Sequence, residues 1–300
     1  MADHDTAQTT AGKGGVWLIM MAAVLWGTTG TSQALAPVGA SPAVVGALRL
    51  AVGGGALLLL ALWRGGLRGG GRWPFWATAS AGGFVAAYQL CFFAAVAKTG
   101  VAVGTMVGIG SSPVLAGILV YLARGERPGR RWLAATVLAI VGCTLLLATG
   151  GTVSVNPLGV ILALGAGASY AAYTLAIKTL LDGRSADAVV AVAFCLGALL
   201  LSPLLVTADL SWLAAPRGLV VILHLGLLAT ALSYQLFGRG LRTVPVANAV
   251  TLSLAEPLTA AILGVTVVGE RLTLPALIGI ALLFSGLALL AITPRRSITG

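Results

Sequence analysis

The sequence predicts an all-α membrane protein with ten transmembrane helices, arranged as two inverted five-helix repeats. Apolar residues make up 58% of the 300 positions and charged residues only 9%, and the mean hydropathy is +1.01. A soluble protein of this length needs more polar surface. Apolar runs of about 20 residues recur along the chain, and each is long enough to cross a hydrocarbon core of roughly 30 Å. An internal repeat gives the grouping of the helices.

The repeat has a fixed offset of 144 residues. Pro113 recurs as Pro257, and the pair Glu126-Arg127 recurs as Glu270-Arg271. Because charges are so rare in this chain, the Glu-Arg register is stronger evidence than any match between apolar residues. In a membrane protein, such a duplication is typical of transport across a site between the halves. We expect a disordered cytoplasmic tail at 1–13, a first repeat at 14–150, a second at 151–293 and a cytoplasmic C-terminal tail at 294–300.

Proline, glycine or charged residues mark the ends of the ten predicted spans. Pro42, Pro157 and Pro245 stand at or near helix starts, where a missing N–H costs nothing. The first apolar run is longer than the apolar region of a cleavable signal peptide, so we expect it to be retained. The spans are expected at 16–36, 43–63, 75–97, 101–123, 132–149, 158–181, 188–207, 218–238, 245–268 and 274–293.

The positions of Lys and Arg predict the orientation. With a cytoplasmic N-terminus, 14 of the 18 basic residues lie on the cytoplasmic side, and only Lys98, Arg217 and Arg271 lie outside. Both termini are then cytoplasmic. Five spans per half is an odd number, so the second half enters the membrane from the opposite side. The repeat is therefore predicted to be inverted.

Two prolines are predicted to lie near the bilayer centre. Pro113 and Pro257 each precede the repeated Glu-Arg pair by 13 residues, or roughly 20 Å of helix. A proline there frees a carbonyl and bends the helix, which favours a break that faces a cavity over a kink needed only for packing. The preceding residues are Ser112 and Glu256. Glu256 is the only acidic residue deep within a predicted span, so it is expected to contact a substrate amine, to couple protons, or to be a protonated acid bonded to a neighbour.

Aromatic residues with polar groups predict the lining of a central cavity. Trp26 and Tyr170 share the 144-residue offset, and each lies roughly ten residues into its helix, deeper than an interfacial belt. The third and eighth spans both carry a Tyr-Gln pair. The predicted cavity residues are Trp26, Tyr88, Gln89, Ser112, Tyr170, Tyr173, Tyr234, Gln235 and Glu256, with helix breaks at Pro113 and Pro257.

Other polar residues have structural explanations. Arg49 can snorkel outward, form a structural bond, or pair with Glu256 or a substrate carboxylate. His224 fits a satisfied core histidine better than a residue with a role in transport. The basic residues lie in short loops without interleaved aromatics, so the net charge of +10 does not indicate nucleic-acid binding. Cys91, Cys143 and Cys195 lie singly in apolar runs, and we expect neither a metal nor a cofactor.

Four motifs resemble a known family. They are Leu25-Trp26-Gly27, Leu48-Arg49-Leu50, Glu256-Pro257 and Gly269-Glu270-Arg271. The chain resembles the EamA-type carriers of the drug/metabolite transporter superfamily, most strongly over 252–290 and less strongly over 108–147. The first half departs from the pattern, with Ser112 where an acid could stand.

The resemblance implies a ten-helix, alternating-access carrier of the bacterial inner membrane. It implies export of amino acids or related small metabolites, with aromatic amino acid exporters the most similar group. Aromatic cavity walls also suit cationic drugs. Less favoured interpretations are an intramembrane enzyme built on Gly110–Pro113 and His224, and a channel. The expected partners are a small-molecule substrate and the lipid bilayer, and the sequence indicates no particular oligomeric state.

Overall fold

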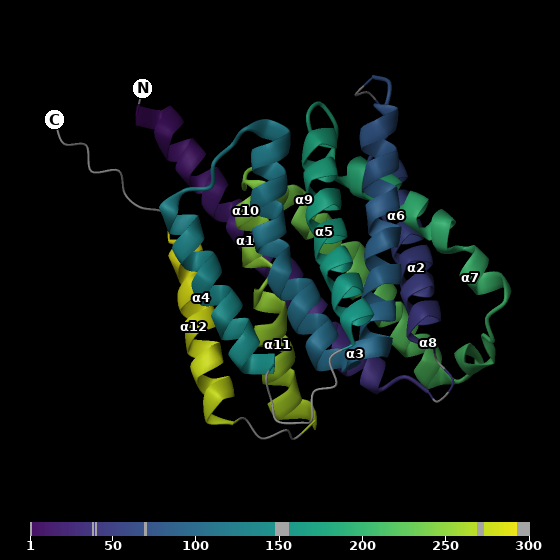
Figure 1. The fold of residues 1–300 in the computed structure, drawn as a ribbon. Coiled ribbons are helices and arrows are strands. Elements are labelled where there is room, and N and C mark those ends of the chain that lie inside the picture. Colours follow the sequence, from purple (N-terminus) through teal and green to yellow (C-terminus); the bar gives the residue numbers. More distant parts are fainter. Residues whose placement is uncertain are drawn as a thin grey trace.

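The computed structural model describes residues 2–37, 39, 41–68, 71–147, 156–268 and 273–292, and these residues form helices and turns without a strand (Figure 1). The α-helices are α1 (Ala2–Ala34), α2 (Pro42–Trp63), α3 (Phe75–Arg124), α4 (Arg130–Leu147), α5 (Pro157–Leu180), α6 (Ala186–Leu201), α7 (Pro203–Val206), α8 (Pro216–Leu223), α9 (Ser233–Leu241), α10 (Val246–Leu252), α11 (Ala255–Leu263) and α12 (Leu274–Ala291). The 3₁₀-helix η1 (Ser211–Ala214) and the π-helices η2 (His224–Leu232) and η3 (Gly264–Val268) complete the order.

Eight helical segments in the described residues are long and apolar enough to cross a membrane. They match eight of the ten predicted spans. The other two, 132–149 and 188–207, coincide with α4 and with α6 followed by α7, and α6 is an apolar helix of 16 residues. The all-helical class is confirmed, and the count of ten spans stays a prediction. Residues 148–149, Glu270-Arg271 and the tail 294–300 lie outside the described part of the chain.

Helix α3 contains both the third and the fourth predicted spans. It is assigned as one helix of 50 residues, yet it folds back on itself between its two legs (Figure 1). A Cβ added at Gly104 would lie 3.1 Å from the Cα of Val96. In a straight helix these positions would be about 12 Å apart. The expected interruption near 98–100 is therefore a sharp bend and not a loop.

The N-terminal segment differs from its prediction. Residues 1–13 were expected to form a disordered tail, whereas α1 begins at Ala2 and runs without interruption into the first apolar run. No proline occurs before Pro37, so nothing removes a backbone donor between the polar segment and the apolar helix.

The contacts between α4 and α12 occur in pairs, as expected for two halves related by a two-fold axis. A Cβ at Gly142 would lie 2.6 Å from the carbonyl oxygen of Gly279, and a Cβ at Gly286 would lie 2.7 Å from that of Ala135. Gly286 is the repeat counterpart of Gly142, and Gly279 is the counterpart of Ala135, so the two contacts are one contact with the halves exchanged. The helices run antiparallel, because the later residue of α4 meets the earlier residue of α12.

The other helix contacts also recur when the two halves are exchanged. Helix α2 packs on its counterpart α6, and α3 packs on α5. The equivalent of the α3–α5 contact is the packing of α1 on η2, α9, α10 and α11. The two halves therefore interlock through a shared interior, and each contributes helices to the centre of the molecule.

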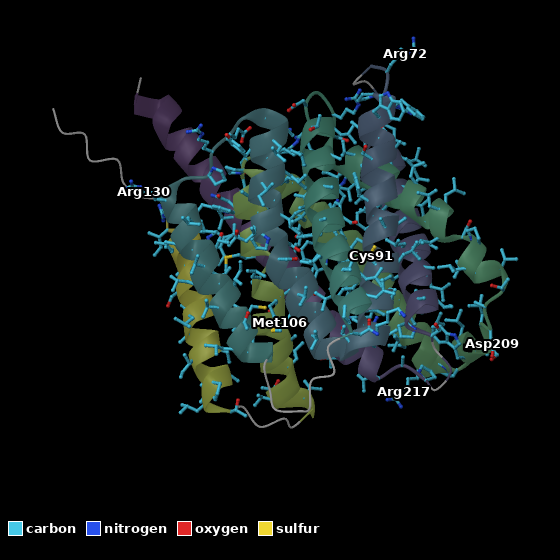
Figure 2. The ribbon with its side chains drawn as sticks, viewed as in Figure 1. Arg72, Cys91, Met106, Arg130, Asp209 and Arg217 are labelled. Carbon is cyan, nitrogen blue, oxygen red and sulfur yellow. The ribbon has the colours of Figure 1, made fainter. Side chains whose placement is uncertain are left out.

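The outer surface and the two ends differ in chemistry. Large apolar side chains are exposed along the sides of the bundle, including Leu59, Trp76, Leu199, Val220 and Phe284. Such a surface is typical of contact with lipid and not with water. Arg72 and Arg130, predicted to be cytoplasmic, lie toward one end of the bundle, and Arg217, predicted to be outside, lies toward the other (Figure 2).

Candidate substrate cavity

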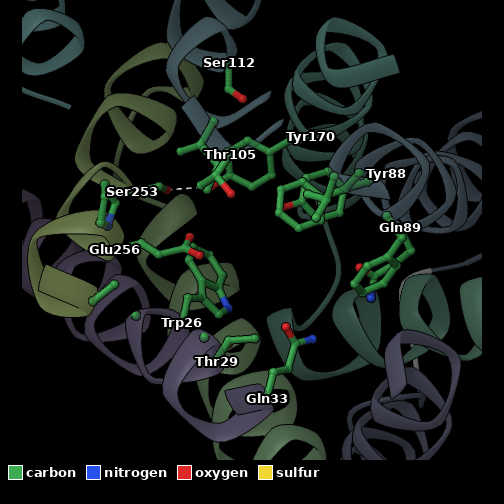
Figure 3. Close-up of a pocket in the computed structure, with 18 of the residues that line it drawn as sticks. Trp26, Thr29, Gln33, Tyr88, Gln89, Thr105, Ser112, Tyr170, Ser253 and Glu256 are labelled. Carbon is green, nitrogen blue, oxygen red and sulfur yellow. Dashed lines mark hydrogen bonds between the residues drawn. The ribbon is translucent and has the colours of Figure 1, made fainter. Parts of the chain in front are cut away.

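A cavity of about 320 Å³ lies between the two halves, within the size range of small-molecule sites (Figure 3). Its walls come from α1, α2 and both legs of α3 in the first half, and from α5, α9, α10 and α11 in the second. The lining extends to Gln33 and Pro42, at the end of α1 and the start of α2. It includes no residue from the opposite ends of these helices.

Aromatic rings form much of the wall. The ring of Trp26 lies 4.7 Å from that of Tyr234 and 6.4 Å from that of Tyr170, centroid to centroid. The Tyr88 ring stacks on Phe92 at 5.7 Å and lies 6.1 Å from Tyr170. These rings come from four different helices, so a flat apolar group in the cavity would contact both halves.

Glu256 stands at a break in the helix that runs from α10 into α11. The α-helix stops at Leu252 and restarts at Ala255, and the N–H of Glu256 donates to the carbonyl of Ser253 at 3.0 Å. Pro257 follows in the first turn, where its missing N–H is tolerated. The Glu256 side chain lines the cavity at the N-terminus of α11, where the helix dipole favours a carboxylate. Its side chain has no hydrogen bond or ion pair with any described residue.

Arg49 reaches the cavity from α2 and is held by the π-helix η2. Its Nε donates to the hydroxyl of Thr230 at 3.1 Å, and Nη2 donates to the carbonyl of Ala229 at 3.3 Å. A π-helical segment displaces carbonyls from the ordinary α-helical ladder and is frequent at functional sites. Here it positions the guanidinium, whose remaining nitrogen, Nη1, has no hydrogen-bond partner among the described residues.

Two polar groups of α1 in the cavity wall are buried without a partner. The indole nitrogen of Trp26 and the hydroxyl of Thr29 form no hydrogen bond in the described structure. Trp26 is only 4% exposed, and both residues line the cavity one helical turn apart. A buried polar group without a partner is costly, so this part of α1 is destabilised in the state that the structure describes.

The predicted cavity residues fall into two groups. Trp26, Tyr88, Gln89, Ser112, Tyr170, Tyr234, Glu256 and Pro257 line the cavity. Tyr173 does not, and instead lines a small adjoining pocket with Arg49, Tyr88 and Tyr234. Gln235 points away, toward a polar cluster described below. At Pro113 the expected break does not interrupt α3, which continues as a helix on both sides of the proline. The hydroxyls of Ser111 and Ser112, just before it, donate to the carbonyl of Gly108.

Several lining residues were not predicted from the sequence. Three interpretations of Arg49 were open, and its position within an apolar run was the observation that could have placed it in the cavity wall. Thr29 and Ser253 could have been found as polar residues three positions from Trp26 and Glu256, on the same helix side. The hydroxyl of Ser253 bonds the hydroxyl of Tyr170 and so ties the break before α11 to α5.

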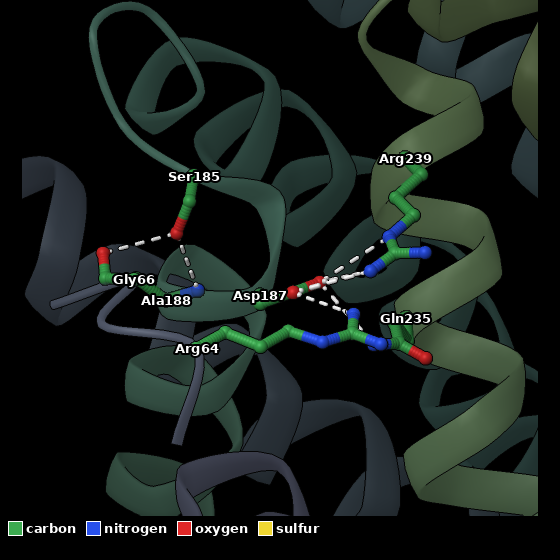
Figure 4. Close-up of polar contacts among 7 residues, drawn as sticks. All are labelled: Arg64, Gly66, Ser185, Asp187, Ala188, Gln235 and Arg239. Carbon is green, nitrogen blue, oxygen red and sulfur yellow. Dashed lines mark hydrogen bonds and ion pairs between the residues drawn. The ribbon is translucent and has the colours of Figure 1, made fainter. Parts of the chain in front are cut away.

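A polar cluster lies where α2 ends and α6 begins, away from the part of the cavity lining at Gln33 and Pro42. Figure 4 shows the contacts within it. Asp187 of α6 accepts from Arg64, after α2, at 3.0 Å and from Arg239 of α9 at 3.1 Å. The amide of Gln235 donates to Asp187 at 3.3 Å, or, rotated, accepts from both arginines. Ser185 caps α6 and also donates to the carbonyl of Gly66. The cluster therefore joins one segment of the first half to two of the second.

Comparison with known proteins identifies the family. The model of the EamA-like transporter family matches residues 13–148 and again residues 157–292. The chain belongs to the EamA-like transporter family. The resemblance inferred from the sequence is thus confirmed, and the chain is a transmembrane transporter.

Individual relatives agree with this assignment. The uncharacterized transporter YwfM of Bacillus subtilis is 46% identical over 289 residues, which cover 96% of this chain and 97% of that protein. The threonine/homoserine exporter RhtA of Escherichia coli strain K12 is 37% identical over 142 residues, 46% of each chain. A solved crystal structure aligns with a TM-score of 0.79 over 92% of this chain and 95% of its own, at 21% sequence identity, which shows a shared fold.

The residues that an intramembrane enzyme would use are bonded elsewhere. The hydroxyl of Ser112 donates to the carbonyl of Gly108 at 2.8 Å, and the ring of His224 bonds the hydroxyl of Thr28 at 2.8 Å. A serine nucleophile needs a base within hydrogen-bond reach. In this structure the two side chains bond to different helices and not to each other.

Proposed function

We propose that the protein is an alternating-access carrier that exports amino acids from the cytoplasm across the bacterial inner membrane, with its binding site in the central cavity. The observation that supports this most directly is the cavity itself, because both halves build its wall and it contains polar and charged groups, which the sequence predicts to lie near the bilayer centre. Transporters with inverted repeats bind their substrates at such a place. The part of the chain that resembles a threonine/homoserine exporter adds support for amino acids and for export.

The cavity also supports a particular resting state. Its lining extends toward Gln33 and Pro42, on the side that the distribution of basic residues assigns to the cell exterior. The Arg64–Asp187–Arg239 cluster closes the side assigned to the cytoplasm. We propose that this is an outward-facing state, with both termini in the cytoplasm and the ten-span, inverted-repeat arrangement predicted from the sequence.

Counterflow in proteoliposomes tests the transport proposal. Vesicles loaded with unlabelled amino acid should transiently accumulate the same labelled amino acid, and the initial rate should saturate with concentration. The panel contains L-phenylalanine, L-tryptophan, L-threonine and L-homoserine, because the wall is aromatic and one relative is named for the last two. Flux without counterflow or saturation would indicate a channel, and no counterflow of any amino acid would contradict the proposal.

Aromatic cations are a second candidate substrate class. The aromatic rings in the wall, together with the carboxylate of Glu256, could hold a flat cation by cation–π and charge interactions. Transport of ethidium in the same vesicles, measured by fluorescence, distinguishes this class from amino acids. A cation would, however, enter a cavity that already contains the guanidinium of Arg49.

A further inference from the structure

The cavity wall contains one positive and one negative side chain. Among the described lining residues, Arg49 and Glu256 are the only members of the Lys, Arg, Asp and Glu types. They reach the cavity from different halves of the chain. The ion pairs of the described structure involve neither of them. Because an unpaired charge inside a membrane protein is costly, this arrangement is suited to a ligand that complements both charges.

Arg49 is prepared for an anionic group. Two of its three guanidinium nitrogens are fixed by Thr230 and Ala229, and Nη1 remains without a partner in the described structure. A guanidinium that is already held in place loses little entropy when it binds a carboxylate.

Glu256 is prepared for a cationic group. Its carboxylate has no hydrogen bond to a described side chain or backbone group, although it lies at the start of α11 beside Ser253. In Figure 3 the carboxylate of Glu256 lies on the same side of the cavity as Trp26, and Tyr88 and Gln89 lie on the other. Tyr88, Phe92 and Tyr170 line the same cavity as Glu256 and Arg49, so a ligand that both charges bind would have aromatic rings available for its remaining atoms.

Building on the proposed transport of amino acids, we propose that Arg49 and Glu256 together select α-amino acid zwitterions. Arg49 binds the α-carboxylate, Glu256 binds the α-ammonium, and the rings of Tyr88, Phe92 and Tyr170 contact the side chain. A ligand with only a positive charge leaves Arg49 unpaired, and a ligand with only a negative charge leaves Glu256 unpaired. Discrimination then comes from the penalty for burying one uncompensated charge.

Single-charge analogues test this assignment. In the counterflow assay, unlabelled L-phenylalanine, L-phenylalaninamide and N-acetyl-L-phenylalanine compete with labelled L-phenylalanine. If another panel amino acid exchanges faster, its own amide and N-acetyl derivatives are used. The amide lacks the carboxylate, and the N-acetyl derivative lacks the ammonium. For the wild-type protein, each derivative should compete about tenfold or more weakly than the parent, as expected for the loss of a charge-assisted hydrogen bond.

Two variants should each lose one of these preferences. In the Arg49→Gln variant, the unlabelled amino acid and its amide should compete equally weakly with the labelled substrate. The preference for the amino acid over its N-acetyl derivative should remain. The Glu256→Gln variant should lose the preference for the amino acid over the N-acetyl derivative and keep the preference for the amino acid over the amide. Arg49→Lys, which retains the positive charge, should keep part of the carboxylate preference. Each ratio is measured within one variant, so it does not depend on the amount of folded protein.

The outcomes separate this inference from the transport proposal. If the wild-type protein exchanges no amino acid, the proposed function is wrong. If it exchanges amino acids but accepts the amide and the N-acetyl derivative as well as the parent, the selection by two charges is wrong. The roles of Arg49 and Glu256 are also wrong if both variants keep both preferences.

Discussion

At the scale of single residues, Glu256 is the group most suited to couple substrate to protons. A carboxylate can hold either a proton or the ammonium of a substrate, and this competition is sufficient for exchange of one for the other. We predict that Glu256→Gln abolishes export driven by an imposed pH gradient and retains exchange at saturating substrate, because an amide cannot release a proton. Fluxes in proteoliposomes with and without the gradient measure both activities.

The control for this variant is Glu126→Gln. Glu126 is exposed beyond the end of α3 and outside the cavity wall, so its substitution should leave both activities unchanged. Gradient-driven flux that survives in Glu256→Gln at the wild-type rate would show that protons are coupled elsewhere or not at all.

The aromatic wall gives a second residue-scale prediction. Tyr88→Leu and Tyr170→Leu keep apolar volume but remove a ring, and we expect each to raise the KM for an aromatic amino acid about two- to tenfold. Tyr170→Leu also removes the hydrogen bond to Ser253, so Tyr88→Leu is the cleaner test of the ring. Tyr121→Leu is the matched control, because Tyr121 is 46% exposed near the end of α3. Equal changes in KM for all three variants would mean that the rings of the cavity do not contact the substrate.

Much of the cavity could be named from the sequence because polar residues are so rare in the spans. Glu256, Trp26 and Tyr170 stand out in apolar runs, and the repeat gives their approximate depth. The partners of Arg49 could not be named, since Thr230 lies 181 positions away on a π-helix that no local pattern indicates. Gln235 was misplaced because neighbouring positions on α9 face different surroundings, and only Tyr234 faces the cavity.

At the scale of helices, two interruptions in regular structure adjoin the cavity. The break before α11 presents Glu256, and η2 holds Arg49. Pro257 indicates the first of these in the sequence, because proline has a definite effect on the backbone. The π-helix η2 contains no proline and was not predicted, whereas the two spans expected at 75–97 and 101–123 are the two legs of α3, joined by a sharp bend.

The contact between α4 and α12 provides a prediction for helix packing. A Cβ at Gly142 would lie 2.6 Å from the carbonyl oxygen of Gly279, so Gly142→Ala must separate the two helices. We expect a loss of about 1–3 kcal/mol in stability, visible as a lower Tm in detergent. Gly55→Ala in α2 is the control, because a Cβ there meets nothing within 4 Å and the substitution favours a helix. A Tm for Gly142→Ala equal to that of Gly55→Ala would contradict the close contact.

At the scale of the whole molecule, the halves meet differently at the two ends. The cavity separates them at one end, and the Arg64–Asp187–Arg239 cluster joins them at the other. The grouping into two repeats could be predicted by counting spans and basic residues. The cluster could not, because Arg64 and Asp187 are 123 positions apart and the repeat does not relate them. In an alternating-access cycle, a cluster in this position must open before substrate can enter from the cytoplasm.

We therefore predict that Asp187→Asn opens the cytoplasmic end more often. Removing the shared carboxylate leaves Arg64 and Arg239 as like charges, at a cost on the order of 1 kcal/mol, because both arginines are partly exposed. Val190 lies on the seam between α6 and α9 and is 0% exposed, so a cysteine there reports opening. In a background without the native cysteines, Val190→Cys should react about fivefold faster with a membrane-impermeant thiol reagent when Asp187→Asn is present.

The control for Asp187→Asn is the same substitution at another acidic residue, Asp209. It lies on an exposed loop and accepts a hydrogen bond from the N–H of Ser211, so Asp209→Asn should leave the labelling rate of Val190→Cys unchanged. High salt should raise the rate in the parent protein and have less effect in Asp187→Asn, because the ion pairs that salt screens are already absent. If Asp187→Asn and its parent react at the same rate in low salt, the cluster does not hold the halves together. The seam between α6 and α9 would then be closed by apolar packing alone.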